Sequence, residues 1–252
     1  MLTAVVLLCL VASCFGGRLP VRPRLDGRIV GGETVNISDY PYQLSLQYYG
    51  IHLCGASIIS TTWALTAAHC VNGYYVSSLS LRAGSSDVGS GGSLHQADQV
   101  IAHPNFNYST MDYDIALIRV SSAFSLSSNV RIIPLPSEGE SVSTGTSAVV
   151  TGWGSTKENG PSVSVLQMVA VPVISNSQCN SDYIGVITDR MLCAGYTNGG
   201  KDACQRDSGG PLAANGKLIG VVSWGSCARS NVSGVYTRVA SLRDWITSNS
   251  GV

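Results

Sequence analysis

From Ile29 onward, the chain alternates short apolar runs with turns rich in glycine and serine. The runs include YQLSLQYY, SLSLRAG, IALIRV, AVVTGWG, LQMVAVPVI and LIGVVSWG. Runs of this length between such turns are typical of β-strands, because helices need longer amphipathic repeats. With 28 glycines and only 12% charged residues, the composition also suits a β protein with many turns. The pattern predicts an all-β barrel or sandwich.

The domain organisation follows from length and from two further segments. A chain of 252 residues can form one large β domain or two smaller ones. The stretch PLPSEGESVSTGTS resembles a linker and divides the chain roughly in half. One helix is expected at the end, in SLRDWITSN, because Leu242, Trp245 and Ile246 would share a face.

The N-terminus, MLTAVVLLCLVASCFGG, predicts secretion. Its apolar run of about ten residues is too short to span a bilayer and resembles the core of a signal peptide. Small residues at Gly16 and Gly17 provide a cleavage point, so we expect residues 1–17 to be removed. No later stretch is long and apolar enough for a membrane anchor, and the product should be soluble and extracellular.

The charge balance limits the expected partners, and the cysteines indicate either disulfides or a metal site. The 15 basic and 15 acidic residues balance, so neither nucleic acid nor a membrane surface is expected as a partner. After loss of the signal segment six cysteines remain, an even number that suggests three disulfides in an oxidising compartment. The rival interpretation is a metal site. Because no CxxC pair occurs and only His69 adjoins a cysteine, we expect no metal and no cofactor.

Three polar segments carry candidate chemistry: LTAAHC, MDYDIALIRV and CQRDSGGP. A hydroxyl is a poor nucleophile near neutral pH unless a base takes its proton, and that base needs an acid to orient it. His69, Asp114 and Ser208 supply these three types of residue. Asp112 is a competing carboxylate. We prefer Asp114 because it directly precedes an apolar run, where a buried acid requires a partner, whereas Asp112 is expected to face water.

These segments resemble the trypsin-like serine proteases of the chymotrypsin fold. The resemblance extends from Ile29 to about Ser248 and includes RIVGG, LTAAHC, DIALI, VTGWG, GGKDACQ, DSGGP, SWG and GVYTRV. It implies two packed antiparallel six-stranded β-barrels with a C-terminal helix. The expected peptidase domain covers residues 29–252, with barrels over about 29–135 and 136–240 and the helix over about 241–249.

The resemblance also implies residue roles. His69 would be the general base, Asp114 its orienting carboxylate and Ser208 the nucleophile, with the N–H groups of Arg206 and Ser208 forming the oxyanion hole. Residues 18–28 would be a propeptide that is cleaved after Arg28, and the freed Ile29 ammonium would pair with Asp207. The alternative is that Arg28 and Ile29 form an ordinary turn before a strand.

Substrate choice follows from the same resemblance. Asp202 matches the acid at the base of the trypsin specificity pocket, which selects Arg or Lys, although it could be a surface acid. The other expected pocket residues are Ala203, Ser223, Trp224, Gly225 and Gly234. The Ala203 methyl cannot hydrogen-bond a lysine ammonium, whereas a guanidinium still pairs with Asp202 in bidentate fashion. We therefore expect Arg to be preferred over Lys.

The family pattern implies the disulfides Cys54–Cys70, Cys179–Cys193 and Cys204–Cys227. Calcium is not expected, because Asp87 is the only acid in the loop SSDVGSGGSLHQ. The pocket rim, SWGSCARS, is one residue shorter than usual. Three triplets match glycosylation acceptors, at Asn36, Asn107 and Asn231.

Arg206 is the main departure from the family, which almost always has glycine at this position. The leading hypothesis is a secreted, monomeric endopeptidase of protein and peptide substrates, with digestion as one of several possible roles. Its binding of protein protease inhibitors would be weakened by Arg206. The alternatives are a catalytically impaired homologue that acts as a binding module, and a protease with elastase-like or chymotrypsin-like selectivity.

Overall fold

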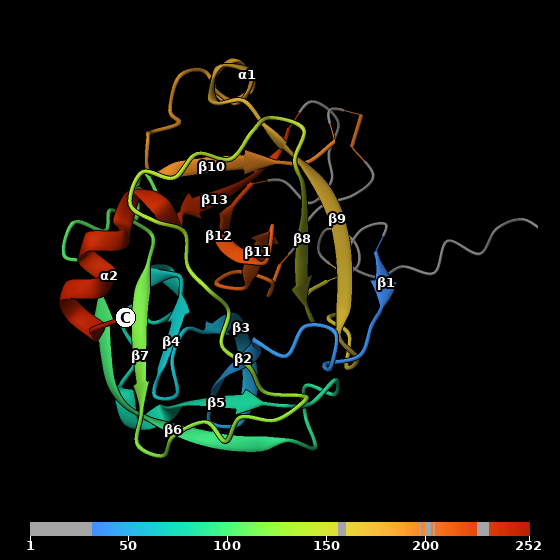
Figure 1. The fold of residues 1–252 in the computed structure, drawn as a ribbon, viewed down its shortest axis with the longest axis vertical. Coiled ribbons are helices and arrows are strands. Elements are labelled where there is room, and N and C mark those ends of the chain that lie inside the picture. Colours follow the sequence, from blue (N-terminus) through green and yellow to red (C-terminus); the bar gives the residue numbers. More distant parts are fainter. Residues whose placement is uncertain (1–31, 156–159, 197, 200–202, 204, 226–231) are drawn as a thin grey trace, which may run out of the picture.

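The computed structural model describes residues 32–155, 160–196, 198, 199, 203, 205–225 and 232–252. Within these ranges the chain forms two closed antiparallel β-barrels, one above the other in Figure 1. The predicted fold class, two antiparallel β-barrels with a C-terminal helix, is therefore confirmed. No helix in the described ranges is both long enough and apolar enough to cross a membrane.

The first barrel closes in the order β2-β3-β4-β7-β6-β5. Its strands are β2 Gln43–Tyr48, β3 Ile51–Ile58, β4 Trp63–Thr66, β5 Leu79–Ala83, β6 Ser93–Ala102 and β7 Ala116–Val120. Buried leucines and isoleucines fill it, among them Leu44, Leu46, Leu65, Leu81 and Ile118. The filled interior excludes water, which makes this barrel a rigid support for the loops at its rim.

The second barrel follows the order β9-β10-β13-β12-β11-β8 and is closed by pairing of β8 with β9, while β1 adds to the edge at β9. The strands are β1 Glu33–Thr34, β8 Ser147–Gly152, β9 Gln167–Ile174, β10 Met191–Ala194, β11 Pro211–Ala214, β12 Lys217–Trp224 and β13 Gly234–Arg238. In β9, buried and partly exposed residues alternate, and Val169, Val171 and Val173 point into the core.

The C-terminal helix links the two barrels. It consists of a short 3₁₀ turn, η3 Val239–Leu242, and α2 Arg243–Ser250, and it ends at Gly251, whose φ of 74° is left-handed. Leu242 and Ile246 join the core of the first barrel although the helix follows the last strand of the second. Figure 1 shows α2 lying beside β7.

A second helix, α1 Asn176–Asp182, was not predicted from the sequence. Its residues, NSQCNSD, have no apolar periodicity, and only Cys179 is buried. Two local features hold it in place. The Ser175 hydroxyl accepts a hydrogen bond from the Gln178 N–H at 3.2 Å, and Cys179 is bonded to Cys193 on β10. A capping serine was the available signal.

Candidate active site

His69 and Asp114 come from adjacent elements of the first barrel and contact each other through two hydrogen bonds. His69 lies on η1 Ala68–Cys70 after β4, and Asp114 directly precedes Ile115 and β7. Asp114 Oδ2 lies 2.7 Å from His69 Nδ1, and Oδ1 accepts the His69 backbone N–H at 2.9 Å. Because an ionised carboxylate can only accept hydrogen bonds, Nδ1 carries a proton and Nε2 is left as the basic nitrogen.

Asp114 is fully buried, so its charge needs partners from several directions. Besides His69, the Ser223 hydroxyl donates to Asp114 Oδ2 at 2.6 Å. The Thr237 hydroxyl donates to the Asp114 backbone carbonyl at 2.6 Å. Ser223 and Thr237 lie on strands β12 and β13 of the second barrel. Asp114 is thus held from both barrels, its carboxylate by Ser223 and its backbone by Thr237, roles that sequence reasoning missed.

Asp112 does not simply face water, and that expectation is wrong. It accepts a two-point contact from Arg190, with Nε–Oδ1 at 2.9 Å and Nη2–Oδ2 at 2.7 Å, and a bond from the Thr188 hydroxyl at 3.0 Å. Burial opposes ionisation, but the hydrogen bonds from Arg190 and Thr188 outweigh it and hold the pKa of Asp112 below its usual value. Asp112 therefore has a structural partner. Of these two acids, only Asp114 contacts a histidine ring nitrogen in the described part of the chain.

Ser208 lies in the turn before β11, packed closely against the first barrel. Its backbone carbonyl accepts the Gly55 N–H at 2.8 Å. A side chain on Gly55 would place its Cβ 2.6 Å from the Gly210 Cα, so the two backbones can approach this closely only because residue 55 is a glycine. This hydrogen bond fixes the position of Ser208 relative to β3.

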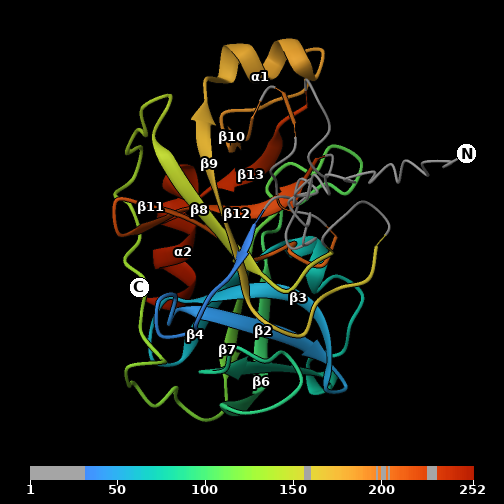
Figure 2. The ribbon, with the colours of Figure 1, turned by 90° about the vertical axis from the view of Figure 1, so that its right-hand side faces the viewer.

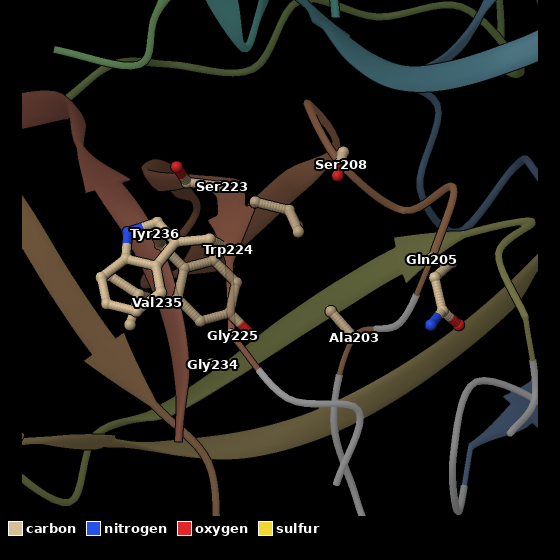
Figure 3. Close-up of a pocket in the computed structure, with 10 residues that line it drawn as sticks. Ala203, Gln205, Ser208, Ser223, Trp224, Gly225, Gly234, Val235 and Tyr236 are labelled. Carbon is tan, nitrogen blue, oxygen red and sulfur yellow. The ribbon is translucent and has the colours of Figure 1, made fainter. Parts of the chain in front are cut away.

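A cavity of about 240 Å³ opens beside Ser208. Figure 3 shows Trp224 and Gly225 on one side of it and Ala203 and Gln205 on the other. Five of the six expected pocket residues line this cavity, and Asp202 lies outside the described residues. The complete lining is Ala203, Gln205, Ser208, Val222, Ser223, Trp224, Gly225, Gly234, Val235 and Tyr236. Gln205, Val222, Val235 and Tyr236 were not predicted, because nothing in their local sequence marks them as lining residues.

Arg206 adopts a left-handed backbone conformation. Its φ is 73°, which costs a residue with a β-carbon about 1–2 kcal/mol. Its Nη1 donates to the Ser162 hydroxyl at 2.9 Å. Its backbone carbonyl lies 3.1 Å from His52 Nε2. The side chain is therefore directed toward the segment before β9, and not into the cavity beside Ser208.

His52 supports this turn in its neutral form. Burial lowers the pKa of His52 to about 4, against the smaller opposing effect of its bond to the Arg206 carbonyl. The ring is therefore uncharged at pH 7, so that Nε2 can donate to Arg206 while Nδ1 accepts from the Ser45 hydroxyl at 2.8 Å. These contacts give His52 a structural role.

Asp207 is fully buried and points into the loop that follows β8. Its Oδ1 accepts the Gly154 N–H at 2.8 Å, and a β-carbon on Gly152 or Gly154 would collide with its carboxylate. The glycines of VTGWG therefore make room for this acid. Arg28 and Ile29, the expected activation residues, lie outside the described residues.

Two of the expected disulfides are present, Cys54–Cys70 and Cys179–Cys193. The first joins β3 to η1 and anchors the turn that carries His69. Cys54, His69 and Cys70 are close enough together to resemble a metal site, but the two sulfur atoms are bonded to each other and are not free thiolates. Cys204, Cys227 and the acceptor Asn231 lie outside the described residues.

Comparison with known proteins agrees with this geometry. A family model described as trypsin matches residues 29–246. The chain is 42% identical to trypsin 5G1 of Aedes aegypti, across 100% of this chain and 97% of that protein. It is 46% identical to trypsin delta of Drosophila melanogaster, across 99% of this chain and 100% of that protein.

Proposed function

The chain belongs to the trypsin family and is a trypsin-like serine endopeptidase, and we propose that it is a secreted zymogen that cleaves after Arg in preference to Lys. The observation that carries this proposal is the buried Asp114 carboxylate, which contacts His69 Nδ1 and also accepts a hydrogen bond from Ser223, a residue that lines the cavity together with Ser208. Residues 1–17 would be the signal peptide and residues 18–28 the propeptide.

The proposed mechanism assigns one step to each group. The Ser208 hydroxyl attacks the peptide carbonyl while His69 Nε2 takes its proton, and Asp114 stabilises the resulting imidazolium. The N–H groups of Arg206 and Ser208 stabilise the oxyanion. His69 then gives its proton to the leaving amine, which departs and leaves an acyl ester on Ser208. Water, activated by the same Nε2, hydrolyses the ester and restores the enzyme.

Activation is the experiment that tests the proposed function. Catalytic amounts of trypsin should release a chain that begins with Ile29-Val30 and should switch on hydrolysis of a small arginine amide. The freed ammonium would pair with Asp207, whose buried carboxylate already accepts the Gly154 N–H. The measurement is N-terminal sequencing alongside activity, with Arg28→Gln as the uncleavable control. Full activity in a chain that still carries residues 18–28 would refute the activation step.

Specificity should depend on Asp202. We expect Asp202→Ser to lower kcat/KM for arginine substrates by about 10²–10³-fold, since it leaves a desolvated cation unpaired. The matched control is Asp39→Ser, which removes an exposed acid far from the cavity lining. The preference for Arg is measured with a peptide library in which the residue directly before the scissile bond is varied among all amino acids. Equal turnover of Arg and Phe substrates by the unaltered enzyme would contradict the assignment.

The Arg206 side chain should weaken the binding of rigid protein inhibitors. This side chain is absent from the cavity lining and contacts Ser162, and we propose that the residues after the scissile bond pass beside it. We expect Arg206→Gly to tighten inhibition by a Kunitz-type inhibitor about tenfold or more, with little change in turnover of a small arginine ester. Ser162→Ala is the matched control, because it removes the Nη1 hydrogen bond while keeping the cation.

The same experiment tests the binding-module alternative. If Arg206→Gly restored activity to an inert enzyme, arginine would have broken the oxyanion hole, and the unaltered protein would be a binding module. Labelling of Ser208 in the unaltered, activated chain by a phosphonate would exclude that alternative.

The remaining proposals concern the oligomeric state, the substrates and the glycans of the secreted protein. We propose a monomer that digests protein or peptide substrates and carries glycans at some of the three acceptor triplets. The side chains of Asn36 and Asn107 are exposed, which is compatible with modification. Mass spectrometry of the secreted protein before and after glycosidase treatment would identify the sites used.

A further inference from the structure

The two barrels meet at a second hollow on the surface, called here the inter-barrel groove. Its lining comes from residues 40–42 before β2, 131–134 between β7 and β8, 147 and 149 on β8, and 213–216 at the end of β11. Its volume is about 410 Å³, against about 240 Å³ for the cavity beside Ser208, and the two share no lining residue. Because sites for small molecules usually have volumes of about 300–1,000 Å³, the groove is large enough for a ligand of its own.

Backbone hydrogen bonds hold the walls of the inter-barrel groove in place. The Arg131 N–H donates to the Pro41 carbonyl at 2.9 Å, and the Leu218 N–H donates to the Pro134 carbonyl at 2.9 Å. These bonds join the connection between β7 and β8 to both barrels. Figure 2 shows this connection along the left-hand edge of the molecule, beside the turn between β11 and β12. A ligand would therefore enter a groove that is already formed, without first ordering a loop.

Apolar residues supply much of the lining of the inter-barrel groove. Among them are Ile132, Ile133, Pro134, Val149 and Ala214. Ile132 is 39% exposed, so it offers apolar surface that a ligand can cover. Gly216 has a φ of 73° and adds no side chain, and a Cβ there would meet nothing within 4 Å, so the turn leaves its side of the groove open. Covering this surface with a hydrocarbon chain would remove apolar area from water and favour binding.

Two phenol groups add hydrogen-bond donors to this lining. The rings of Tyr40 and Tyr42 lie 6.3 Å apart between centroids, edge to face. Burial raises the pKa of Tyr42 well above its usual value, and burial also raises the pKa of Tyr40, helped by the charges of Asp39 and Glu33. Both hydroxyls therefore keep their protons at pH 7. Neither has a hydrogen-bond partner in the described part of the chain, and neither is among its fully buried polar atoms, so both are free to donate to a ligand.

Arg131 is the one charged residue among the described residues that line the groove, and neither Asp39 nor Glu33 lines it. Arg131 is exposed, and its guanidinium has no ion pair or hydrogen bond within the described residues. The lining thus has a single positive charge and no acid, which favours an anion. A dianion such as phosphate would keep a second, unpaired charge beside apolar surface. A carboxylate has one charge, is ionised at pH 7 and matches a guanidinium through two hydrogen bonds.

We propose that the inter-barrel groove binds a small apolar monocarboxylate, such as a fatty acid. The hydrocarbon chain covers Ile132 and the apolar residues beside it, and the carboxylate accepts hydrogen bonds from the Arg131 guanidinium and from the hydroxyls of Tyr40 and Tyr42. This inference does not rest on the proposed function, because the groove and the cavity beside Ser208 have no residue in common. Binding is expected in the unactivated chain as well as in the activated enzyme.

The test is calorimetric titration of the full, unactivated chain at pH 7 with decanoate, octanoate and decan-1-ol, each below the concentration at which it forms micelles. We expect decanoate to bind about tenfold more tightly than octanoate, since it buries two further methylene groups. Decanoate should also bind about tenfold more tightly than decan-1-ol, which has the same chain without the charge. Added salt should weaken the binding of decanoate and change that of decan-1-ol little.

Variants of the lining separate the charge from the apolar contact. Arg131→Gln should weaken decanoate binding about tenfold and leave decan-1-ol binding unchanged. The double variant Tyr40→Phe, Tyr42→Phe should also weaken decanoate binding, because it removes both donors and keeps both rings. The matched control is Arg119→Gln on β7, which removes a cation paired with Asp98 outside the groove and should change neither affinity. Thermal unfolding without ligand shows that each variant is folded.

The proposal would be overturned by equal affinity for decanoate and decan-1-ol, or by a loss of decanoate binding in Arg131→Gln no greater than in Arg119→Gln. A third contrary result comes from the activated enzyme. If decanoate competed with a small arginine ester, and did so equally in Arg131→Gln, it would bind in the cavity beside Ser208 and not in the groove. Concentration-dependent dimers that Arg131→Gln abolishes, without any binding of decanoate, would assign the groove to self-association and also overturn the proposal.

Discussion

The Ser208→Ala variant, activated in the same way as the unaltered chain, is expected to hydrolyse a small arginine ester about 10⁶-fold more slowly. Alanine removes the only atom that forms the acyl ester, so His69 and Asp114 are left with no hydroxyl to activate. The loss should be in kcat and leave KM within a few fold, because the cavity beside residue 208 keeps its other lining residues. The loss in kcat is this large because Ser208, His69 and Asp114 act as one unit, so removing one of them removes the contribution of all three.

Two measurements make the Ser208 prediction specific. A serine-directed phosphonate should label the unaltered enzyme and not Ser208→Ala. Combining Ser208→Ala with a second change at His69 should cost little more than Ser208→Ala alone, because the first change already disables the unit. A residual activity above one hundredth of the unaltered enzyme would mean that a different residue is the nucleophile.

The Asp114→Asn variant is expected to lower kcat by about 10⁴-fold, the size that this change has in the family member from which the mechanism was worked out. The physical reason is visible in the contacts of the carboxylate. Asp114 accepts hydrogen bonds from His69 Nδ1, the His69 N–H and the Ser223 hydroxyl. An amide has one accepting oxygen, and its NH₂ group facing Nδ1 would leave the proton on Nε2, which then cannot act as a base.

Asp112→Asn is the matched control, two residues away on the same segment. Its carboxylate pairs with Arg190 and does not touch His69, so kcat should change by less than about tenfold while the protein loses some stability. Stopped-flow kinetics and thermal unfolding of both variants separate the two effects. If Asp112→Asn lost as much kcat as Asp114→Asn, the assignment of the orienting carboxylate would be wrong.

The strands and the all-β class could be predicted from the sequence because strand signals are local, whereas the pair of barrels was expected from the family resemblance. Valines spaced two apart in LQMVAVPVI place their side chains on one face of β9, and Val169, Val171 and Val173 are buried there. Helix α1 could not be predicted in the same way. It has one buried residue and is held by a disulfide to β10, a contact that no periodicity within NSQCNSD encodes.

The residue types of the candidate site were also readable from the sequence, and their supporting contacts were not. His69, Asp114 and Ser208 stand in distinctive short motifs, and Asp114 precedes an apolar run that had to bury it. Ser223 was expected only as a wall of the pocket. Ser223 does line the cavity, but its hydroxyl also donates to a carboxylate 109 residues away, and Asp112 pairs with a guanidinium 78 residues away.

The sequence by itself therefore determined the strand pattern, the all-β class and the residues able to carry acyl transfer, because each depends on neighbours along the chain. Tertiary structure alone decided which charges are paired, where the Arg206 side chain lies and which tyrosines gather at the end of the first barrel. A buried carboxylate is stabilised by whichever donors the closed barrels bring within about 3 Å of it, and an exposed ring joins whichever rings the neighbouring turn presents. Both depend on the packing of distant segments, which no local pattern specifies.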